Sequence, residues 1–240
     1  ETQISLAVTA PKARIVDKAF KDKQVAPKVM IVILGGLLMG LLIPFALIYL
    51  FELFDNKIKS KHDIEKISND IPIIGEVPQL EKGDNELVKI NDMSPLAESL
   101  RILITNMNFM VGKKKGKVVF VTSTVKGEGK TFVSVNLGLT IASPNKKTII
   151  IGADIRNPQL QRYNEERKGL KGLTEFLYED SLDYKTLVHK SIYNQYLDVM
   201  YSGSIPPNPT DLLSNGKFEN LIQELSQHYD YIILDTAPLM

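Results

Sequence analysis

The sequence predicts an α/β domain with a mainly parallel sheet and helices on both of its faces, preceded by one transmembrane helix. From Lys117 onward, short apolar segments rich in β-branched residues alternate with segments of helical pattern. This alternation is typical of parallel sheets that are covered on both faces. Nearer the N-terminus, residues 29–51 carry no charge, and a bilayer core requires roughly 20 apolar residues in a helix.

The composition limits the possible classes of function. The 240 residues allow one or two domains with a sizeable core. A formal net charge of +1 gives no general attraction to polyanions, so we expect no nucleic-acid partner. The sequence has no cysteine, which excludes disulfides and thiolate metal sites. It opens on Glu1 and stops at Met240 after an apolar run, and we expect a fragment cut at both ends.

Residues 29–51 are best interpreted as a membrane span. The run is too long for the apolar part of a signal peptide, and no small-residue cleavage site follows it. Lysines flank it on both sides, so the positive-inside rule gives no clear orientation. Residues 52–70 are rich in charge and are expected to connect the span to the domain at residues 71–240.

The local pattern predicts the elements of the α/β domain. Strands are expected at residues 117–123, 147–154, 197–203 and 229–235. Helices are expected to begin near Lys130, Gly172, Thr210 and Phe218. In front of them, "IPIIGEVP" at residues 71–78 predicts a short strand between prolines, and residues 95–110 have apolar residues at helical spacing.

A phosphate-binding loop follows the first of these strands. The segment "TSTVKGEGKTF" leads from the strand into a helix, and the N–H groups of a helix start bind anions. Lys130 can reach the β- and γ-phosphates, and the Thr131 hydroxyl can ligate Mg²⁺. The strict motif fails at its first position, Thr124, so a chance Gly-Lys-Thr in an ordinary turn is the alternative. The residues expected to bind ATP phosphates are Gly127, Glu128, Gly129, Lys130, Thr131 and Phe132.

An aspartate at the end of the last strand fits the same site. Asp235 follows the apolar run "YIIL", and open α/β sheets bind their ligands at the carboxyl ends of strands. Such an aspartate commonly holds Mg²⁺ or its water.

Together these motifs resemble the bacterial tyrosine kinases of capsule and exopolysaccharide export, a branch of the P-loop ATPases that includes ParA and MinD. The resemblance covers nearly the whole chain. The segments that carry it are the loop itself, "IIIGADIRNP", "YIILDTAP", "ARIVDKA" before the span, "SPLAESLRILITNM", "GLTEFL" and "SGSIPPNPTDLLSN".

The resemblance implies a role for each site residue. Lys130 and Thr131 match the Walker A lysine and Mg²⁺ ligand. Asp154 matches the second aspartate of the Walker A′ motif, Asp-x-Asp, and Asp235 matches the Walker B aspartate. The implied catalytic residues are therefore Lys130, Asp154 and Asp235, and the implied metal ligands are Thr131, Asp154 and Asp235.

The resemblance also implies the biology. Residues 1–28 match the end of a periplasmic chain-length determinant module, and residues 71–240 match a cytoplasmic kinase domain at the bacterial inner membrane. Such kinases transfer the γ-phosphate of ATP to a C-terminal tyrosine cluster on a neighbouring subunit of a ring-like homo-oligomer. Their partners are the polysaccharide polymerisation and export machinery and a cognate tyrosine phosphatase.

The chain departs from the family pattern in three places. Gly152 stands where the first Walker A′ aspartate is expected. Ile104 replaces the second arginine of the oligomerisation motif, which leaves Glu98 and Arg101. The tyrosine cluster is expected beyond Met240. We therefore expect ATP binding with a reduced rate of transfer.

Two alternatives belong to other functional classes: a co-polymerase that uses nucleotide as an assembly switch, and a membrane-tethered ATPase like ParA or MinD. Among the remaining residues, Lys126 is interpreted as a solvated loop charge. Arg156 is interpreted as half of a structural salt bridge, with a phosphate or nearby acid as the other option. The nine tyrosines are interpreted as packing residues. The three histidines have no metal-binding spacing; they are His62, His189 and His228.

Overall fold

The computed structural model describes residues 26–55, 57–58, 60–67, 70–112 and 114–239. They fall into two compact units, Glu1–Asp70 and Ile71–Met240, and each unit is described by itself. Most of the segment predicted to end a periplasmic module, residues 1–28, lies outside the described residues, so that assignment stays a prediction.

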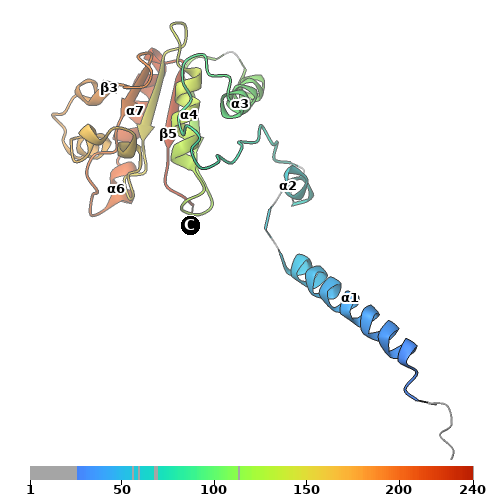
Figure 1. The fold of residues 1–240 in the computed structure, drawn as a ribbon. Helices are drawn as coiled ribbons and strands as arrows, with labels where there is room; N and C mark the ends of the chain where they lie inside the picture. Colours follow the sequence, from blue (N-terminus) through green and yellow to red (C-terminus); the bar gives the residue numbers. More distant parts are fainter. Residues whose placement is uncertain (1–25, 56, 59, 68–69, 113, 240) are drawn as a thin grey trace, which may run out of the picture. The chain divides into compact units, whose positions relative to one another are not determined.

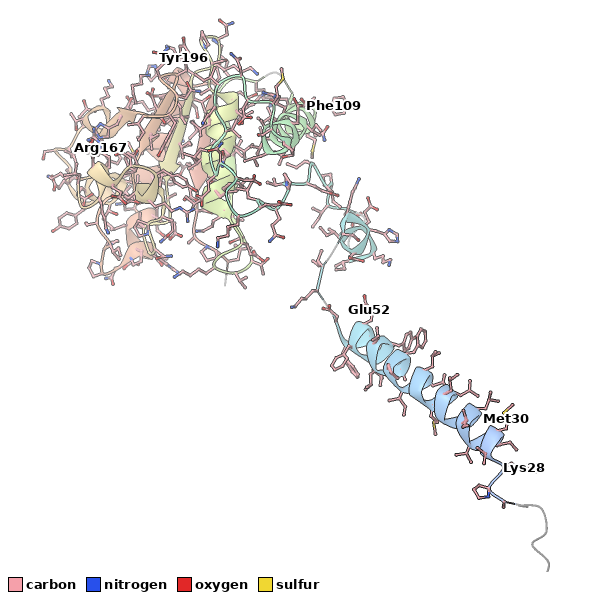
Figure 2. The ribbon with its side chains drawn as sticks, viewed as in Figure 1. Lys28, Met30, Glu52, Phe109, Arg167 and Tyr196 are labelled. Carbon is pink, nitrogen blue, oxygen red and sulfur yellow. The ribbon has the colours of Figure 1, made fainter. Side chains whose placement is uncertain are left out.

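The first unit contains one long apolar helix, α1 (Val29–Phe54), and a short helix, α2 (Lys61–Ile67) (Figure 1). Helix α1 continues through Pro44 and buries none of its side chains within the molecule. Figure 2 shows its side chains, between Met30 and Glu52, projecting outward all around the helix. Because α1 is apolar on every side and long enough to cross a bilayer, it is a candidate membrane span.

The second unit is built on a five-stranded sheet in the order β1-β5-β2-β4-β3. The strands are β1 (Lys117–Val121), β2 (Thr148–Gly152), β3 (Val188–Lys190), β4 (Leu197–Met200) and β5 (Tyr231–Asp235). Four of them pair in parallel, and only β3 runs antiparallel, against β4. The predicted α/β fold with a mainly parallel sheet is therefore confirmed.

Helices cover both faces of this sheet. One face packs against α3 (Pro95–Val111) and α4 (Lys130–Ile141). The other packs against α5 (Leu173–Tyr178) and α7 (Lys217–His228). A short helix, α6 (Pro209–Leu213), and three 3₁₀ turns complete the unit: η1 (Leu160–Tyr163), η2 (Glu165–Arg167) and η3 (Tyr184–Leu187).

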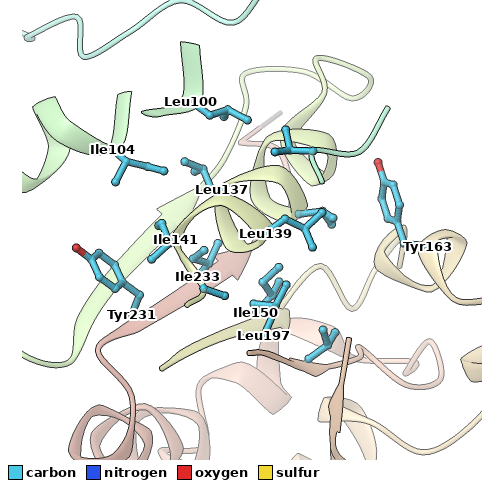
Figure 3. Close-up of a cluster of buried hydrophobic side chains, with 14 of the residues drawn as sticks. Leu100, Ile104, Leu137, Leu139, Ile141, Ile150, Tyr163, Leu197, Tyr231 and Ile233 are labelled. Atoms are coloured by element: carbon cyan, nitrogen blue, oxygen red, sulfur yellow. The ribbon is translucent and has the colours of Figure 1, made fainter. Parts of the chain in front are cut away.

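The apolar cluster on the α3/α4 face is shown in Figure 3. Leu100 of α3 and Leu137 of α4 meet Ile150 and Ile233 from the strands. Ile150 and Ile233 are almost completely buried, because central parallel strands are covered on both faces. This packing fixes the amino-terminal end of α4 beside the carboxyl ends of β2 and β5.

Helix α3 matches the helix predicted at residues 95–110 to within one residue. The Ser94 side chain caps the helix by accepting from the Ala97 N–H at 3.2 Å, and Pro95 occupies the first turn. The helix stops at Gly112, whose φ of 74° is a left-handed value that favours glycine.

Two details of the predicted secondary structure are wrong. Residues 71–78 form no strand; the segment is extended but packs its backbone against α3, where Asn106 Nδ2 donates to the Ile74 carbonyl at 2.8 Å. Prolines at both of its ends also remove two N–H donors from any ladder. Conversely, β3 was not predicted, since three residues on a sheet edge give no periodic signal.

Candidate nucleotide site

The loop between β1 and α4 has the backbone conformation of a phosphate cradle. Gly127 and Gly129 have φ values of 96° and 89°, which side-chain-bearing residues rarely adopt. Gly129 is the N-cap of α4 and offers no side-chain acceptor to the first-turn N–H groups. Those groups therefore remain available for an anion, as at other helix starts that bind phosphate.

Lys130 and Asp154 form a buried ion pair in the centre of the site. Lys130 Nζ lies 2.9 Å from Asp154 Oδ2, and the two side chains are only 9% and 2% exposed. The other oxygen, Asp154 Oδ1, accepts from the Asn157 N–H at 3.0 Å. A lysine held this way next to the glycine loop can exchange its carboxylate partner for phosphate oxygens.

Asp235 is held by hydroxyl groups from α4. Thr131 Oγ1 donates to Asp235 Oδ2 at 2.8 Å, and Ser134 Oγ donates to Oδ1 at 3.4 Å. Burial raises the pKa of the Asp235 carboxyl, although the Thr131 bond and the charge of Lys130 oppose this. The Asp154 N–H also donates to the Asp235 carbonyl at 2.8 Å, which joins the two strand ends.

The three oxygen-bearing side chains fit a hard divalent cation. Thr131, Asp154 and Asp235 converge at the start of α4, and Mg²⁺ takes few protein oxygens when nucleotide phosphates supply others. The described residues contain no cluster of three or more acidic, histidine or cysteine side chains of the kind that holds a metal alone. Three oxygen donors of this kind fit a metal whose other ligands are nucleotide phosphates and water.

The Glu128 side chain binds the backbone of the loop itself. Its carboxylate oxygen Oε2 accepts from the Thr124 and Val125 N–H groups at 2.8 and 3.2 Å. The side chain therefore braces the start of the loop. Any contact of Glu128 with phosphate would come from its backbone.

Gly152 lies in a position with no room for a side chain. A β-carbon built there would be 2.4 Å from Ser202 Oγ, 3.0 Å from Ser202 N and 3.4 Å from Leu160 Cδ2. Ser202 is 1% exposed, and its hydroxyl has no hydrogen-bond partner among the described residues. The sequence shows that position 152 lacks the carboxylate of the family pattern. It does not indicate that Ser202 occupies the space where that side chain would lie.

A wall of the pocket comes from a segment that sequence reasoning missed. The cavity, of about 350 Å³, is lined by the glycine loop and by Leu80, Glu86, Asn157, Gln159 and Arg162. Asn136 of α4 is fully buried and ties this segment in place. Its Oδ1 accepts from the Val88 N–H at 2.8 Å, and its Nδ2 donates to the Glu86 carbonyl at 2.9 Å.

The predicted oligomerisation residues lie together on α3. Arg101 Nη1 is 2.6 Å from Glu98 Oε1, and the guanidinium also donates to the Asp92 carbonyl. Ile104 is only 8% exposed and packs in the core. A role for Glu98 and Arg101 between subunits stays a prediction.

Three other sequence interpretations can be compared with the structure. Arg156 Nη2 donates to the Thr210 hydroxyl at 3.1 Å, and no salt bridge of Arg156 is found among the described residues; that interpretation is wrong. Lys126 lines the pocket and is exposed, as a solvated loop charge would be. Of the described tyrosines, four are exposed, so the packing interpretation holds for only part of them: Tyr49, Tyr178, Tyr193 and Tyr196.

The comparisons with known proteins agree with this geometry. A family model described as an AAA domain matches residues 116–240. The chain belongs to the AAA-domain family. Tyrosine-protein kinase wzc of Salmonella typhi is 29% identical over 261 residues, which cover 100% of this chain and 35% of that protein. Tyrosine-protein kinase CpsD of Streptococcus pneumoniae is 39% identical over 132 residues, 55% of this chain and 57% of that protein.

Solved structures give the same result. The BceF tyrosine kinase domain has a TM-score of 0.62 and 31% identity, and the match covers 76% of this chain and 77% of that chain. The predicted resemblance to the bacterial tyrosine kinases is therefore confirmed. The chain spans about a third of the length of the Salmonella relative.

Proposed function

We propose that this chain is the membrane-anchored nucleotide-binding part of a protein-tyrosine kinase that uses ATP and Mg²⁺. The observation that carries the proposal is the convergence of Lys130, Thr131, Asp154 and Asp235 at the glycine loop. The names of the relatives support the reaction class. The resemblance supports a bacterial inner-membrane location, a cytoplasmic kinase domain and a role in capsule or exopolysaccharide export.

Each site residue has a physical role in this proposal. The loop N–H groups and Lys130 hold the β- and γ-phosphates. Lys130 breaks its ion pair with Asp154 when it binds them. Thr131, Asp154 and Asp235 hold the metal, which supplies neutralisation of the charge on the phosphate oxygens. Because phosphoryl transfer depends mainly on positioning and charge neutralisation, these residues account for most of the chemistry.

At position 152 the site lacks a carboxylate that could act as a base on the acceptor tyrosine. A tyrosine hydroxyl has an unperturbed pKa of ~10, so a nearby base accelerates its attack on phosphate. Gly152 provides no carboxylate at the position where the family has one. We therefore propose that nucleotide binding is retained and that transfer is slow.

The same resemblance suggests the partners. We propose a ring-like homo-oligomer formed through the kinase domain, which acts with the polysaccharide polymerisation and export machinery and is reset by a cognate tyrosine phosphatase. In such an assembly the acceptor tyrosines belong to a neighbouring subunit.

The proposal is tested with the full-length protein purified in detergent. Binding of Mg²⁺-ATP is measured by calorimetry, and phosphotyrosine formed from γ-labelled ATP is measured on the same samples. Lys130→Ala should abolish both, whereas Lys168→Ala, at an exposed lysine outside the pocket lining, should preserve both. Nucleotide binding with no phosphotyrosine would instead support an assembly switch. Rapid release of phosphate with no phosphotyrosine would support a ParA- or MinD-like ATPase.

A further inference from the structure

Arg162 is a cation on the rim of the nucleotide pocket, and the reaction described so far does not use it. It belongs to η1, eight residues after Asp154 in the sequence. Arg162 lines the same cavity as Gly127, Gly129 and Lys130. Arg162 therefore borders the space in which the loop and Lys130 would hold phosphates.

In the structure this guanidinium has two partners. Arg162 Nη2 is 3.2 Å from Glu86 Oε2, and its Cζ lies 4.9 Å from the centre of the Tyr163 ring. Glu86 also lines the cavity. The carboxylate that neutralises Arg162 is therefore itself part of the phosphate pocket, where it would repel a polyphosphate.

The ion pair is of a kind that exchanges easily. The side chains of Arg162 and Glu86 are 52% and 62% exposed, and exposed pairs contribute little because water screens them. A guanidinium binds two phosphate oxygens at once through its planar fork. A bound triphosphate therefore competes well with one exposed carboxylate for Arg162.

The backbone of Glu86 is fixed, so the ion pair can break only by movement of the two side chains. The Glu86 carbonyl accepts from Asn136 Nδ2 at 2.9 Å, and the Val88 N–H donates to Asn136 Oδ1 at 2.8 Å. Val88 is also buried in the core. Arg162, in contrast, has a long side chain that can turn from the rim toward the loop while its backbone stays in η1.

We propose that Arg162 is an additional nucleotide-phosphate ligand and that Glu86 pairs with it when no nucleotide is bound. On nucleotide binding, the guanidinium exchanges the Glu86 carboxylate for phosphate oxygens. Glu86 therefore opposes binding through Arg162, and Arg162 favours it. This inference rests on the proposed nucleotide site and adds two residues to it.

The test measures the dissociation constant of the full-length protein in detergent for Mg²⁺ with a non-hydrolysable ATP analogue. Glu86→Gln should tighten binding roughly 2- to 5-fold, because it removes the competing partner of an exposed pair. Arg162→Gln should weaken binding roughly 3- to 10-fold. In the double variant, Glu86→Gln should tighten binding less than it does in the wild type, since part of its effect acts through Arg162.

A matched control removes a carboxylate from an exposed pair outside the pocket. Glu179 Oε2 lies 2.8 Å from Lys171 Nζ, and Glu179→Gln should leave the dissociation constant unchanged. The inference is overturned if Arg162→Gln binds like the wild type. It is also overturned if Glu86→Gln tightens binding equally with and without Arg162, because the cause would then be general repulsion. Failure of the wild type to bind the analogue at all would instead refute the proposed function.

Discussion

The close contact between Gly152 and Ser202 predicts that the two positions are energetically coupled. Replacing Gly152 by alanine places a β-carbon 2.4 Å from Ser202 Oγ and 3.0 Å from Ser202 N. Overpacking a well-packed interior costs typically ~1–3 kcal/mol. Alanine offsets part of this overpacking cost, because alanine within a strand is more favourable than glycine by roughly 0.5–1 kcal/mol. We therefore expect Gly152→Ala to lower the free energy of unfolding by about 1–2 kcal/mol.

Ser202→Ala removes the oxygen that a side chain at 152 would meet. The Ser202 hydroxyl is buried and has no hydrogen-bond partner among the described residues, so its loss should be nearly neutral. In the double variant, the cost of alanine at 152 should fall by about 1 kcal/mol, which is a typical coupling between residues in contact. The destabilisation that remains reflects the contacts of the alanine β-carbon with Ser202 N and Leu160.

The assay is thermal unfolding of the full-length protein in detergent. The sequence has no tryptophan and nine tyrosines, so circular dichroism and tyrosine fluorescence are suitable signals. At about 2–4 °C per kcal/mol for a domain of this size, Gly152→Ala should lower the midpoint by roughly 2–8 °C. An equal loss with and without Ser202→Ala would refute the reasoning, as would an unchanged midpoint for Gly152→Ala.

Three further predictions concern other residues. Asn136→Ala should lower the free energy of unfolding by about 2–4 kcal/mol, because buried backbone groups at residues 86–88 lose their partners; urea unfolding measures this. Asp235→Asn should raise the thermal midpoint at pH 7 while abolishing Mg²⁺-nucleotide binding. Burial raises the pKa of that carboxyl in the folded state, so its charge costs stability. Glu128→Ala should weaken nucleotide binding roughly 3- to 10-fold, whereas Glu128→Gln should retain most of it, since the amide oxygen still accepts from the loop.

Each of these has a control or a contradicting result. For Asn136, the exposed neighbour Asn85 is a matched control, and Asn85→Ala should unfold like the wild type. For Asp235, stability of the wild type should fall as pH rises from the ordinary aspartate pKa of ~3.9 through the raised pKa. The advantage of Asp235→Asn should therefore vanish below that window, and a lower midpoint at pH 7 would contradict the argument. For Glu128, equal weakening by both variants would show that bracing the loop is not its role.

The local pattern of the sequence was sufficient to predict the fold and the residues that lie together at the candidate site. Continuous apolar runs define β2 and β5 and end at Gly152 and Asp235. The glycines of the loop have positive φ values, and the residues after them begin α4. Such features depend on near neighbours in the chain, so a single sequence contains them.

Contacts between distant segments could not be predicted in this way. Asn136 looks like any polar residue inside a helix, yet it binds residues 86–88 about fifty positions away. Ser202 occupies the space that a side chain at position 152 would need. It follows β4, and only the order of strands in the sheet brings the end of β4 next to the end of β2. Arg162 and Glu86 are unremarkable surface charges until the fold places both on one pocket.

We propose that the site retains nucleotide binding and transfers phosphate slowly because position 152 lacks a carboxylate. The most direct test compares the wild type with the double variant Gly152→Asp, Ser202→Ala, which restores the acid and removes its closest contact, Ser202 Oγ. The measurement is the rate of phosphotyrosine formation, on the protein itself and on an acidic tyrosine copolymer, beside the dissociation constant for Mg²⁺-ATP. We predict dissociation constants that agree within about threefold and a rate at least ~10-fold higher in the variant, since a positioned base contributes ~10²–10⁴-fold. An equal rate in the two proteins, or a gain in binding with no gain in rate, would contradict the claim.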